Sequence, residues 1–455
     1  MNNLLLINPP VYDFAAFDLW SKPLGLLYLT SILQKQGSEV TLLDYMDRNF
    51  LENCDNFEQN KVSANKNFIQ KSNEYGCGHY IKTRVQKPDI LKNIPRYYCR
   101  YGLPKEFAYN RLKEFACKEF AGKKFDLIIV TSIMTYWYLG VFEAIETVKN
   151  IFPDVPVVLG GAYATLCFEH AQKSGADIVL KGNLSALNDV FKLKNIKAAI
   201  PCDFKDYPIP YYPPNQNTQY AVLRISQGCP FRCAYCAQDI LTGGKYYVKS
   251  CETVFNEIKN FAQKGIKNIV FYDDALLYNA DNVIKPLLRK IISANLKLNI
   301  HTPNGLHLRY LDLELARLMK QANFISPRFS LETVNPSIQK NTGAKVSNQI
   351  FEEKVAILNA AGFQRGQYII YLLMGMPQQS LKDVEESIQY AHKHGGKVSL
   401  SQYSPIPHTS AFGSFENFIN EPLLQNKSVY PLYNVNDWEE INRIKNLAIK
   451  LNSML

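Results

Sequence analysis

Three cysteines in one short loop constrain this chain more than any other feature of its sequence. Cys229, Cys233 and Cys236 stand in the segment SQGCPFRCAYC (226–236), with three and then two residues between them. A loop with this spacing can wrap one inorganic cluster and aim all three thiolates inward, and thiolates are the usual protein ligands of a 4Fe-4S cluster. The next cysteine, Cys251, lies fifteen residues further on, so the loop has no local fourth ligand. We therefore predict a cluster with one open iron, because catalytic metal sites keep a free position.

The same loop resembles the signature of the radical SAM superfamily, in which an aromatic residue, here Tyr235, precedes the last cysteine. The resemblance implies that S-adenosylmethionine chelates the open iron and is cleaved to methionine and a 5′-deoxyadenosyl radical. An external electron donor would reduce the cluster. Two other interpretations of the thiols stay open. One is a structural zinc site, although such sites normally use four ligands at paired spacings, and the other is burial as inert side chains.

The first part of the chain predicts a parallel α/β domain. Apolar strands are expected at 4–8, 40–43, 127–130, 157–159 and 178–180, and helices at 24–35 and 141–149. Strands that alternate with helices indicate a parallel sheet covered on both faces. Such sheets bind ligands beyond the carboxyl ends of their strands. We therefore expect a Rossmann- or flavodoxin-like domain over residues 1–195.

The ligand of this domain is not a dinucleotide or a nucleoside triphosphate bound by a P-loop, because the chain lacks both glycine-rich signatures. Three stretches, NPP (8–10), KPLGL (22–26) and VLGGA (158–162), resemble the cobalamin-binding domain that precedes many radical SAM barrels. The resemblance implies cobalamin at the strand ends, where a glycine pair lets a bulky ligand approach the backbone. The alternative is a flavodoxin-like fold without a cofactor. The candidate cobalamin-binding residues are Tyr12, Ser132, Met134, Tyr136, Gly160 and Gly161.

From residue 219 the alternation of strands and helices resumes. Strands are expected at 221–226, 268–272, 298–301, 328–331, 367–373 and 397–400. Six strands with intervening helices resemble the partial (β/α)6 TIM-like barrel of the radical SAM family. Barrels of this kind work at the carboxyl ends of their strands, and polar residues gather there in this sequence.

Carboxylates at these strand ends are the expected contacts of S-adenosylmethionine. By resemblance, Asp273 and Asp274 stand where the family holds the amino group of the methionine moiety. Glu332 stands where a polar residue meets the ribose hydroxyls, and carboxylates accept hydrogen bonds from both an ammonium group and a diol. Each could instead cap a helix or lie at the surface. The cofactor-binding residues predicted in this half are Tyr235, Asp273, Asp274, Ser330 and Glu332.

We expect four segments along the chain. They are a cobalamin-binding-like domain at 1–195 with a basic insertion at 50–125, a proline-rich linker at 196–218, a radical SAM partial barrel at 219–410, and a C-terminal extension at 411–455. The extension holds an amphipathic helix near 437–451, which is typical of core packing against a barrel.

The positive charge of the chain is concentrated in one segment. Residues 61–124 hold 15 Lys and Arg against 5 Asp and Glu, and this local excess equals the net charge of +10 of the whole chain. The favoured interpretation is a partly helical cap that meets an anionic substrate or the cobalamin phosphate. Basic residues interleaved with aromatics can also bind single-stranded nucleic acid, which is the alternative partner.

The sequence as a whole predicts a cytoplasmic enzyme. No apolar run is long enough for a membrane span, and the N-terminus lacks the features of a secretory signal. The expected function is a radical SAM enzyme that uses a 4Fe-4S cluster, S-adenosylmethionine and cobalamin to methylate an unactivated carbon of a small-molecule or peptide substrate. The alternatives are a radical rearrangement or cyclisation without methyl transfer, an RNA-modifying enzyme, and a non-catalytic cobalamin or redox sensor.

Overall fold

The chain forms two compact units. The computed structural model describes residues 1–49, 72–116, 124–213, 218–429 and 437–455. Unit 1 comprises Met1–Thr218 and Asn417–Leu424, and unit 2 comprises Gln219–Glu416 and Gln425–Leu455. The predicted C-terminal extension therefore divides between the two units. Its short excursion into unit 1 is held by the Tyr138 hydroxyl, which donates to the Glu421 carboxylate at 3.0 Å.

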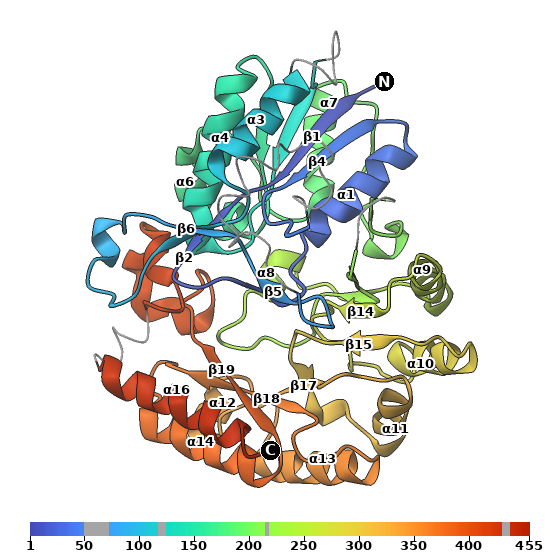
Figure 1. Ribbon diagram of the computed structural model, residues 1–455, viewed down its shortest axis with the longest axis vertical. Coiled ribbons are helices and arrows are strands. Elements are labelled where there is room, and N and C mark those ends of the chain that lie inside the picture. Colours follow the sequence, from blue (N-terminus) through green and yellow to red (C-terminus); the bar gives the residue numbers. More distant parts are fainter. Residues whose placement is uncertain (50–71, 117–123, 214–217, 430–436) are drawn as a thin grey trace, which may run out of the picture. The chain divides into compact units, whose positions relative to one another are not determined.

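Unit 1 is built on a five-stranded parallel sheet with the order β10-β9-β8-β1-β4 (Figure 1). Counted along the chain, this order is the flavodoxin-like 2-1-3-4-5 arrangement. Every residue of β1 is buried, as expected of a central strand that is covered on both faces. The flavodoxin-like fold predicted for this part of the chain is confirmed. The strands are β1 (Asn3–Asn8), β4 (Glu39–Asp44), β8 (Leu127–Val130), β9 (Val157–Leu159) and β10 (Ile178–Val179).

Helices α1 and α4 lie on opposite sides of this sheet (Figure 1). Helix α1 follows Pro23 and ends before Gly37, whose φ of +82° suits a residue without a side chain. Its apolar stripe includes Leu26, Leu29 and Leu33, all of which are buried. The helices of unit 1 are α1 (Leu24–Lys35), α3 (Lys105–Glu114), α4 (Tyr138–Ile151), α5 (Ala162–Leu166), α6 (Phe168–Ala171) and α7 (Leu187–Leu193).

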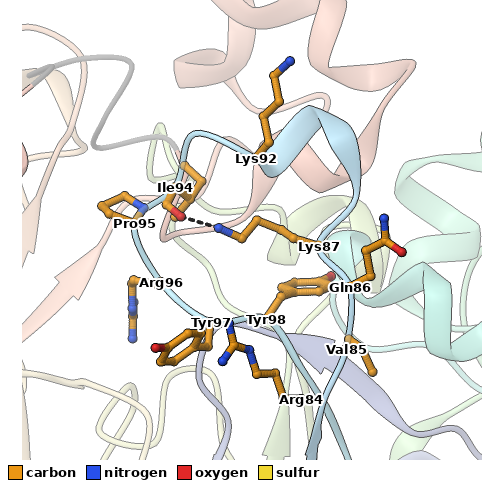
Figure 2. Close-up of a pocket in the computed structure, with 10 residues that line it drawn as sticks. All are labelled: Arg84, Val85, Gln86, Lys87, Lys92, Ile94, Pro95, Arg96, Tyr97 and Tyr98. Atoms are coloured by element: carbon orange, nitrogen blue, oxygen red, sulfur yellow. Dashed lines mark hydrogen bonds between the residues drawn. The ribbon is translucent and has the colours of Figure 1, made fainter.

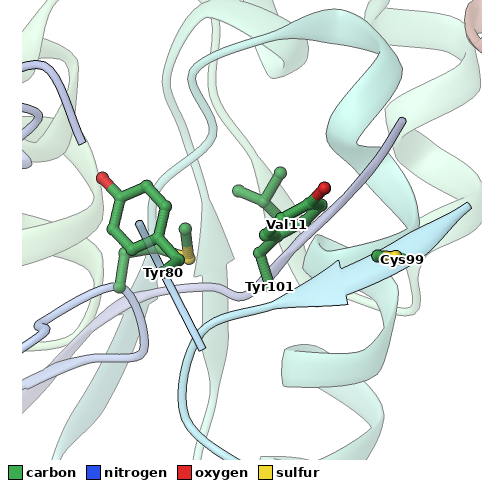
Figure 3. Packing of buried hydrophobic residues seen from close by; sticks show 5 residues of the cluster. Val11, Tyr80, Cys99 and Tyr101 are labelled. Atoms are coloured by element: carbon green, nitrogen blue, oxygen red, sulfur yellow. The ribbon is translucent and has the colours of Figure 1, made fainter. Parts of the chain in front are cut away.

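The described part of the basic insertion contains helix α3, as a partly helical segment requires, and also a small antiparallel sheet that the sequence analysis does not predict. Strands β6 (Lys82–Arg84) and β7 (Cys99–Tyr101) pair with β2 (Val11–Asp13) in the order β2-β7-β6. Cys99 packs with Val11, Tyr80 and Tyr101 in a buried cluster (Figure 3). The insertion also forms the short strand β5 (Gly78–His79), which pairs with β3 (Phe17–Asp18). Its residues 50–71 and 117–123 lie outside the described residues.

Much of the predicted proline-rich linker packs onto unit 1. Phe204 and Tyr207 each lie edge-on to Tyr28 of α1, with ring centroids 5.7 Å apart in both pairs. The amide of Tyr211 donates to the carbonyl of Leu27 at 3.0 Å. Aromatic side chains between the prolines therefore anchor a segment that its composition alone predicts as an extended connection.

Unit 2 contains the six predicted strands and one that was not predicted, β16, in two parallel sheets with the orders β11-β14-β15 and β16-β17-β18-β19. Among the described residues, only a single bridge between Ile300 and Phe324 continues the ladder beyond β15. The partial barrel is confirmed as a parallel α/β arrangement, and no closed barrel forms in the described chain. The strands are β11 (Tyr220–Leu223), β14 (Asn268–Phe271), β15 (Asn299–His301), β16 (Leu306–His307), β17 (Arg328–Glu332), β18 (Ile369–Met374) and β19 (Lys397–Gln402).

Two helices of unit 2, α9 and α14, begin at the capping residues that the sequence predicts. Ser250 accepts a hydrogen bond from the amide of Thr253, and Ser380 forms a complete capping box with Asp383. The helices lie along the outside of the strands (Figure 1), and Asn452 of α16 bonds both backbone groups of Val398 in β19. Within the described residues, no helix is both long and apolar enough to cross a bilayer. The helices are α8 (Gln238–Thr242), α9 (Cys251–Gln263), α10 (Ile284–Ser293), α11 (Leu313–Gln321), α12 (Pro336–Asn341), α13 (Asn348–Ala360), α14 (Leu381–Lys393) and α16 (Trp438–Asn452).

Candidate active site in unit 2

The cysteine loop follows a short antiparallel pairing of two strands, each two residues long. Strand β12 (Ser226–Gln227) pairs antiparallel with β13 (Tyr247–Val248) just before the first cysteine. Gly228 follows with a φ of +92°, and a Cβ atom there would lie 1.9 Å from the carbonyl oxygen of Lys245. Glycine is therefore required at this position, both by the backbone angle and by the close approach of the facing strand.

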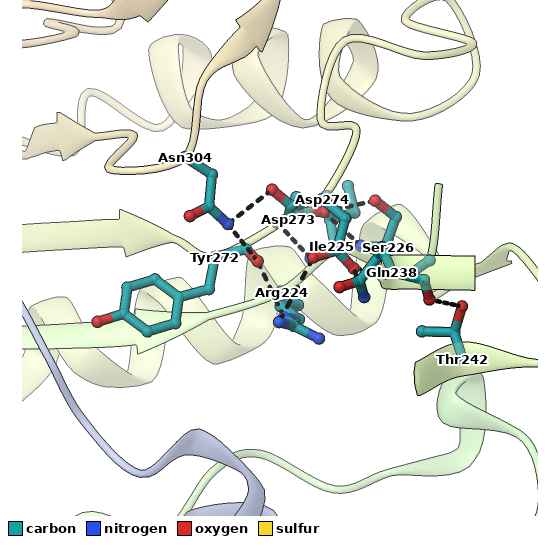
Figure 4. A network of polar contacts seen from close by, with 10 residues as sticks. Arg224, Ile225, Ser226, Gln238, Thr242, Tyr272, Asp273, Asp274 and Asn304 are labelled. Carbon is teal, nitrogen blue, oxygen red and sulfur yellow. Dashed lines mark hydrogen bonds and ion pairs between the residues drawn. The ribbon is translucent and has the colours of Figure 1, made fainter. Parts of the chain in front are cut away.

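Two adjacent aspartates at the end of β14 hold this loop in place (Figure 4). One carboxylate oxygen of Asp273 accepts hydrogen bonds from the amide and the hydroxyl of Ser226, both at 2.6 Å. Asp274 accepts from the amide of Gly228 at 2.9 Å and from the side-chain amide of Gln238 at 2.8 Å. Both carboxylates therefore accept hydrogen bonds from residues of this chain that flank the cysteines. Asp273 is only 3% exposed, and burial raises its pKa to about 7.

The three cysteines open into one cavity of about 460 Å³. This volume lies within the roughly 300–1,000 Å³ of typical small-molecule sites. Of the predicted site residues in unit 2, only Asp273 does not line the cavity, because its carboxylate lies beneath the loop. The predicted residues that do line it are Cys229, Cys233, Cys236, Tyr235, Asp274, Ser330 and Glu332, and further lining residues include Asn304, His307, Lys345 and Tyr371.

A polar trio of Tyr235, Glu332 and Lys345 forms one wall of the cavity. The Tyr235 hydroxyl donates to the Glu332 carboxylate at 2.7 Å, and the Lys345 ammonium group donates to the Tyr235 hydroxyl at 3.0 Å. Lys345 also pairs with Glu332 at 3.5 Å, and both side chains are largely buried. Burial lowers the pKa of Lys345, but the Glu332 carboxylate and the cysteine sulfurs outweigh that effect and raise the pKa above its usual value. Lys345 is therefore a cation beside the thiols.

The backbone around Glu332 is unusual for a residue with a side chain. Glu332 has a φ of +70°, and the pairing of β17 with β18 shifts register between Ser330 and Glu332. A left-handed residue at a bulge costs free energy and is typical of functional sites, where it aims a side chain away from the regular strand. Here it brings the carboxylate into the trio.

The loop before Lys345 packs directly on the cysteine loop. Gly343 has a φ of +114°, and a Cβ atom there would lie 3.4 Å from the Cα atom of Cys233. On another side of the cysteine loop, Phe231 stacks on the ring of His307 with centroids 4.7 Å apart. Burial lowers the pKa of His307 to about 3, so this ring is neutral at physiological pH. The cysteines are thus fixed by packing on both sides.

Burial opposes the loss of protons from the three thiols. Burial raises the pKa of Cys229 to about 11, and burial also raises the pKa of Cys233 and of Cys236. Lys345 acts in the opposite direction on all three. A metal centre must therefore displace these protons, as thiolate ligation generally requires. The nearby ammonium group favours the charged form that results.

The donor set fits a 4Fe-4S cluster. Among the described residues, no group of three or more His, Cys, Asp or Glu side chains converges closely enough to hold one metal ion. In a four-iron cluster each thiolate binds its own iron, so the sulfurs need not converge on a single point. Cys229, Cys233 and Cys236 line one cavity together with the cation of Lys345, so each thiolate can bind its own iron of such a cluster.

The predicted cobalamin residues of unit 1 lie at the carboxyl edge of its sheet, and several are used by the fold itself. The Ser132 hydroxyl donates to the carbonyl of Gly160 at 2.7 Å. Gly161 has a φ of +96°, and a Cβ atom there would lie 2.2 Å from the carbonyl oxygen of Ser132. Gly161 is therefore glycine because two loops touch. At Gly160, by contrast, no atom lies within 4 Å of an added Cβ atom.

The other candidates of unit 1 also differ in how much space they leave for a ligand. The Tyr12 hydroxyl donates to Glu143 at 2.5 Å, and Glu143 forms a bidentate ion pair with Arg100. Tyr136 is buried, whereas Met134 is 42% exposed. Met134 and Gly160 are thus the predicted residues with open space for a ligand, and the Tyr12 hydroxyl belongs to an internal network.

The sequence analysis missed Lys345 and the Arg100–Glu143 pair. Lys345 lies 110 residues from Tyr235 along the chain, and no motif joins them. The only local signal is Gly343, since a glycine in a turn can mark a close approach to another part of the chain. That signal does not say which part.

A scan against protein-family models gives one match in this unit. Residues 223–391 match the Radical SAM superfamily model. This part of the chain is a radical SAM domain. The match covers the cysteine loop, the two aspartates and the whole polar trio, and it confirms the resemblance of this segment to the radical SAM superfamily. A radical SAM domain implies a 4Fe-4S cluster and S-adenosylmethionine, for which the cavity has the donors described above.

Curated relatives have low identity to this chain. An uncharacterized methyltransferase, PH0819, from Pyrococcus horikoshii is 24% identical over 60% of this chain and 65% of its own length. The ribosomal protein uS12 methylthiotransferase RimO from Prochlorococcus marinus is 27% identical over 44% of each chain. The chain therefore spans less than two thirds of the length of these relatives.

Solved structures show the same fold over nearly the whole chain. The radical S-adenosylmethionine methyltransferase TsrM from Kitasatospora setae, solved with tryptophan and an S-adenosylmethionine analogue, has a TM-score of 0.63 at 16% identity and covers 90% of this chain and 75% of its own. The cobalamin-dependent S-adenosylmethionine radical enzyme OxsB, solved with aqua-cobalamin and S-adenosylmethionine, has a TM-score of 0.57 at 12% identity and covers 99% of this chain and 61% of its own. At these identities the likeness establishes the fold of both units.

Proposed function

We propose that this chain is a cobalamin-dependent radical SAM methyltransferase that methylates an unactivated carbon of a small-molecule or peptide substrate. The observation that carries the proposal is the cavity that joins Cys229, Cys233 and Cys236 to the polar trio. When bound, the 4Fe-4S cluster supplies the electron that cleaves S-adenosylmethionine, and cobalamin supplies the methyl transfer. The chain's own residues bind and orient these groups.

Different residues of the cavity bind the cluster and the nucleotide. The three thiols hold the cluster, and the Lys345 ammonium group offsets the negative charge that their deprotonation creates. The Glu332 carboxylate already accepts the Tyr235 hydroxyl, and its second oxygen can accept a ribose hydroxyl. Asp274 is fixed by two donors of the loop, so it positions the cysteines and closes the cavity beside them.

The carboxyl edge of the unit 1 sheet supports a cobalamin site. Ile133 and Met134 follow β8 and are 45% and 42% exposed, although both are large and apolar. Gly160 follows β9 with open space where a side chain would stand. Exposed apolar side chains at this edge of an open parallel sheet are typical of a ligand site. The structures of TsrM and OxsB with cobalamin bound support the assignment, since their fold covers this unit as well.

Anaerobic reconstitution with iron, sulfide and hydroxocobalamin, followed by incubation with S-adenosylmethionine and a low-potential reductant such as dithionite, tests the proposal. We expect iron-sulfur absorption and the formation of both 5′-deoxyadenosine and S-adenosylhomocysteine. Cys236→Ala should lose the absorption and both products. Cys251→Ala is the matched control, because Cys251 begins α9 and does not line the cavity, and it should retain them.

Three outcomes would contradict the proposal in different ways. Zinc in place of iron in the purified protein would remove the radical chemistry altogether. Deoxyadenosine without S-adenosylhomocysteine would favour a rearrangement or cyclisation. Cofactor binding without any cleavage of S-adenosylmethionine would favour a sensor. Product analysis by mass spectrometry with candidate amino acids and peptides would then identify the methylated carbon.

A further inference from the structure

A second cavity lies in unit 1, in the connection between β6 and β7, where neither the cluster nor the cobalamin edge requires one. It has a volume of about 700 Å³ and is lined by residues 84–87, 92 and 94–98 (Figure 2). This volume lies within the roughly 300–1,000 Å³ of typical ligand sites. The cavity belongs to the basic segment that carries the net charge of the chain.

The walls of this cavity are preformed. Strands β6 and β7 pair in antiparallel register up to Arg84, and the amide of Val85 extends the ladder to the carbonyl of Tyr98 at 3.1 Å. At the far end of the connection, Leu91 and Ile94 are 1% and 5% exposed and anchor it to the core. The Lys87 ammonium group donates to the carbonyl of Ile94, and the two residues point toward each other across the connection (Figure 2). A ligand would therefore meet a shaped site.

The lining is cationic without a balancing acid. Arg84, Lys87, Lys92 and Arg96 line the cavity, and its lining, all within the described chain, includes no Asp or Glu. None of the ion pairs among the described residues involves Arg84, Lys87 or Lys92. Lys87 uses one donor on the Ile94 carbonyl and keeps two more. Arg84, Lys87 and Lys92 around one hollow repel one another unless an anion joins them.

An exposed aromatic ring stands beside these charges. The ring of Tyr97 is 65% exposed, although a tyrosine in a strand connection usually packs against its neighbours. The Arg84 guanidinium group covers one face of that ring, with 3.7 Å between its carbon and the ring centroid. An arginine that lies over a ring keeps the N–H donors at the edge of its own guanidinium plane, where they are available to an anion. Ring and guanidinium together form a flat platform.

We propose that this cavity binds a compact phosphorylated ligand with a planar ring, of the size and chemistry of a nucleoside diphosphate. The cations at Arg84, Lys87 and Lys92 would bind the phosphates, because charge-assisted hydrogen bonds to phosphate are strong. The Tyr97 ring would stack on the planar group. The cavity is confined to one connection between two strands, which favours a compact ligand over a strand of nucleic acid, because nucleic acid needs a continuous groove. This inference does not rest on the proposed methyl transfer.

Calorimetric titration of the full chain with ADP and with pyrophosphate at low salt tests the proposal. We expect one saturable site for each ligand. Arg84→Gln with Lys92→Gln should weaken both by about tenfold or more, since two charge-assisted bonds are lost. Tyr97→Ala should weaken ADP by about tenfold and leave pyrophosphate unchanged.

The matched control is Lys192→Gln with Lys194→Gln, which removes the same charge from two exposed residues at the C-terminal end of α7. It should bind both ligands as the parent does. If thermal melting shows that the double variant at the cavity is unfolded, Lys92→Gln alone replaces it, because Lys92 is exposed.

Several results would overturn the inference. The first is that neither ADP nor pyrophosphate binds, and the second is that the α7 control loses as much affinity as the double variant at the cavity. The third is that added pyrophosphate releases bound hydroxocobalamin, which would assign the cations to the cobalamin phosphate. A single-stranded RNA dodecamer that binds more tightly than ADP, with a salt dependence of several phosphates, would assign the cavity to nucleic acid instead.

Discussion

Replacing Lys345 with methionine would remove the cation of the polar trio while keeping a long side chain. Lys345 lies 3.5 Å from the Glu332 carboxylate, and the two side chains are 15% and 10% exposed. At an effective dielectric constant of about 20, two unit charges at that distance attract by about 5 kcal/mol. Desolvation of both groups offsets part of this gain. Removing one partner of such a pair generally destabilises a protein by about 3–5 kcal/mol, because the other charge stays buried.

A double-mutant cycle separates the pair from the individual losses. Lys345→Met, Glu332→Gln and the double variant are compared by urea unfolding, with Trp438 as the probe of unit 2 in a background where Trp20 and Trp137 are phenylalanine. We expect a coupling of about 2 kcal/mol, so that the double variant is less destabilised than the two single losses together.

The matched control for this cycle is Lys340→Met, which removes an exposed lysine from the neighbouring α12. It should change the unfolding free energy by less than about 0.5 kcal/mol. A coupling below about 0.5 kcal/mol, or equal losses from Lys340→Met and Lys345→Met, would refute the electrostatic account of the trio. Reconstituted Lys345→Met should also hold less iron than the control, measured by iron content per chain.

Three further predictions concern the residues that support the two sites. Burial raises the pKa of Asp273 to about 7, so between about pH 4 and 7 the folded state holds a proton that the unfolded state has released. The free energy of unfolding should therefore fall as pH rises through that window, by up to about 1.4 kcal/mol per pH unit. Asp273→Asn should abolish this slope, measured as urea midpoints against pH. Gly228→Ala should lower the free energy of unfolding by about 2 kcal/mol or more and lower the iron content, because its added Cβ atom meets a backbone carbonyl oxygen at 1.9 Å. Gly243→Ala, with open space and a φ of +66°, should lower the free energy of unfolding by about 1 kcal/mol and keep the iron. Equal effects of the two substitutions would argue against the steric reason. Arg100→Met should destabilise unit 1 by about 3–5 kcal/mol, because it leaves the Glu143 carboxylate buried without its cation, and a loss under about 1 kcal/mol in hydrogen exchange of unit 1 peptides would contradict that role.

Much of the secondary structure could be predicted because its causes are local. Helix α1 begins and ends at the residues expected from Pro23 and Gly37, and the capping box at Ser380 forms as its spacing predicts. A cap or an apolar stripe depends on residues within one or two turns, which the sequence places side by side. The same holds for the cysteine loop, whose ligands lie within eight positions of one another.

The folding of the basic insertion and the linker could not be predicted in this way. Cys99 and Tyr101 belong to a strand whose partner is Val11–Asp13, almost ninety residues earlier. The segment near Tyr211 looks extended by composition, yet its aromatic neighbours pack on α1. Pairing and packing over such separations depend on which surfaces the rest of the chain leaves open, and periodicity carries no information about that.

The sequence by itself determined the order of the α/β elements and the thiols that can hold a cluster. The tertiary structure decided what surrounds those thiols. It placed Asp273 beneath the loop rather than in the cavity, and it brought Lys345 beside Glu332 through a left-handed residue and a bulge. Charges act over a few ångströms of space whatever their separation along the chain. The identity of a ligand is therefore local in the sequence, whereas the electrostatic environment that tunes it exists only after folding.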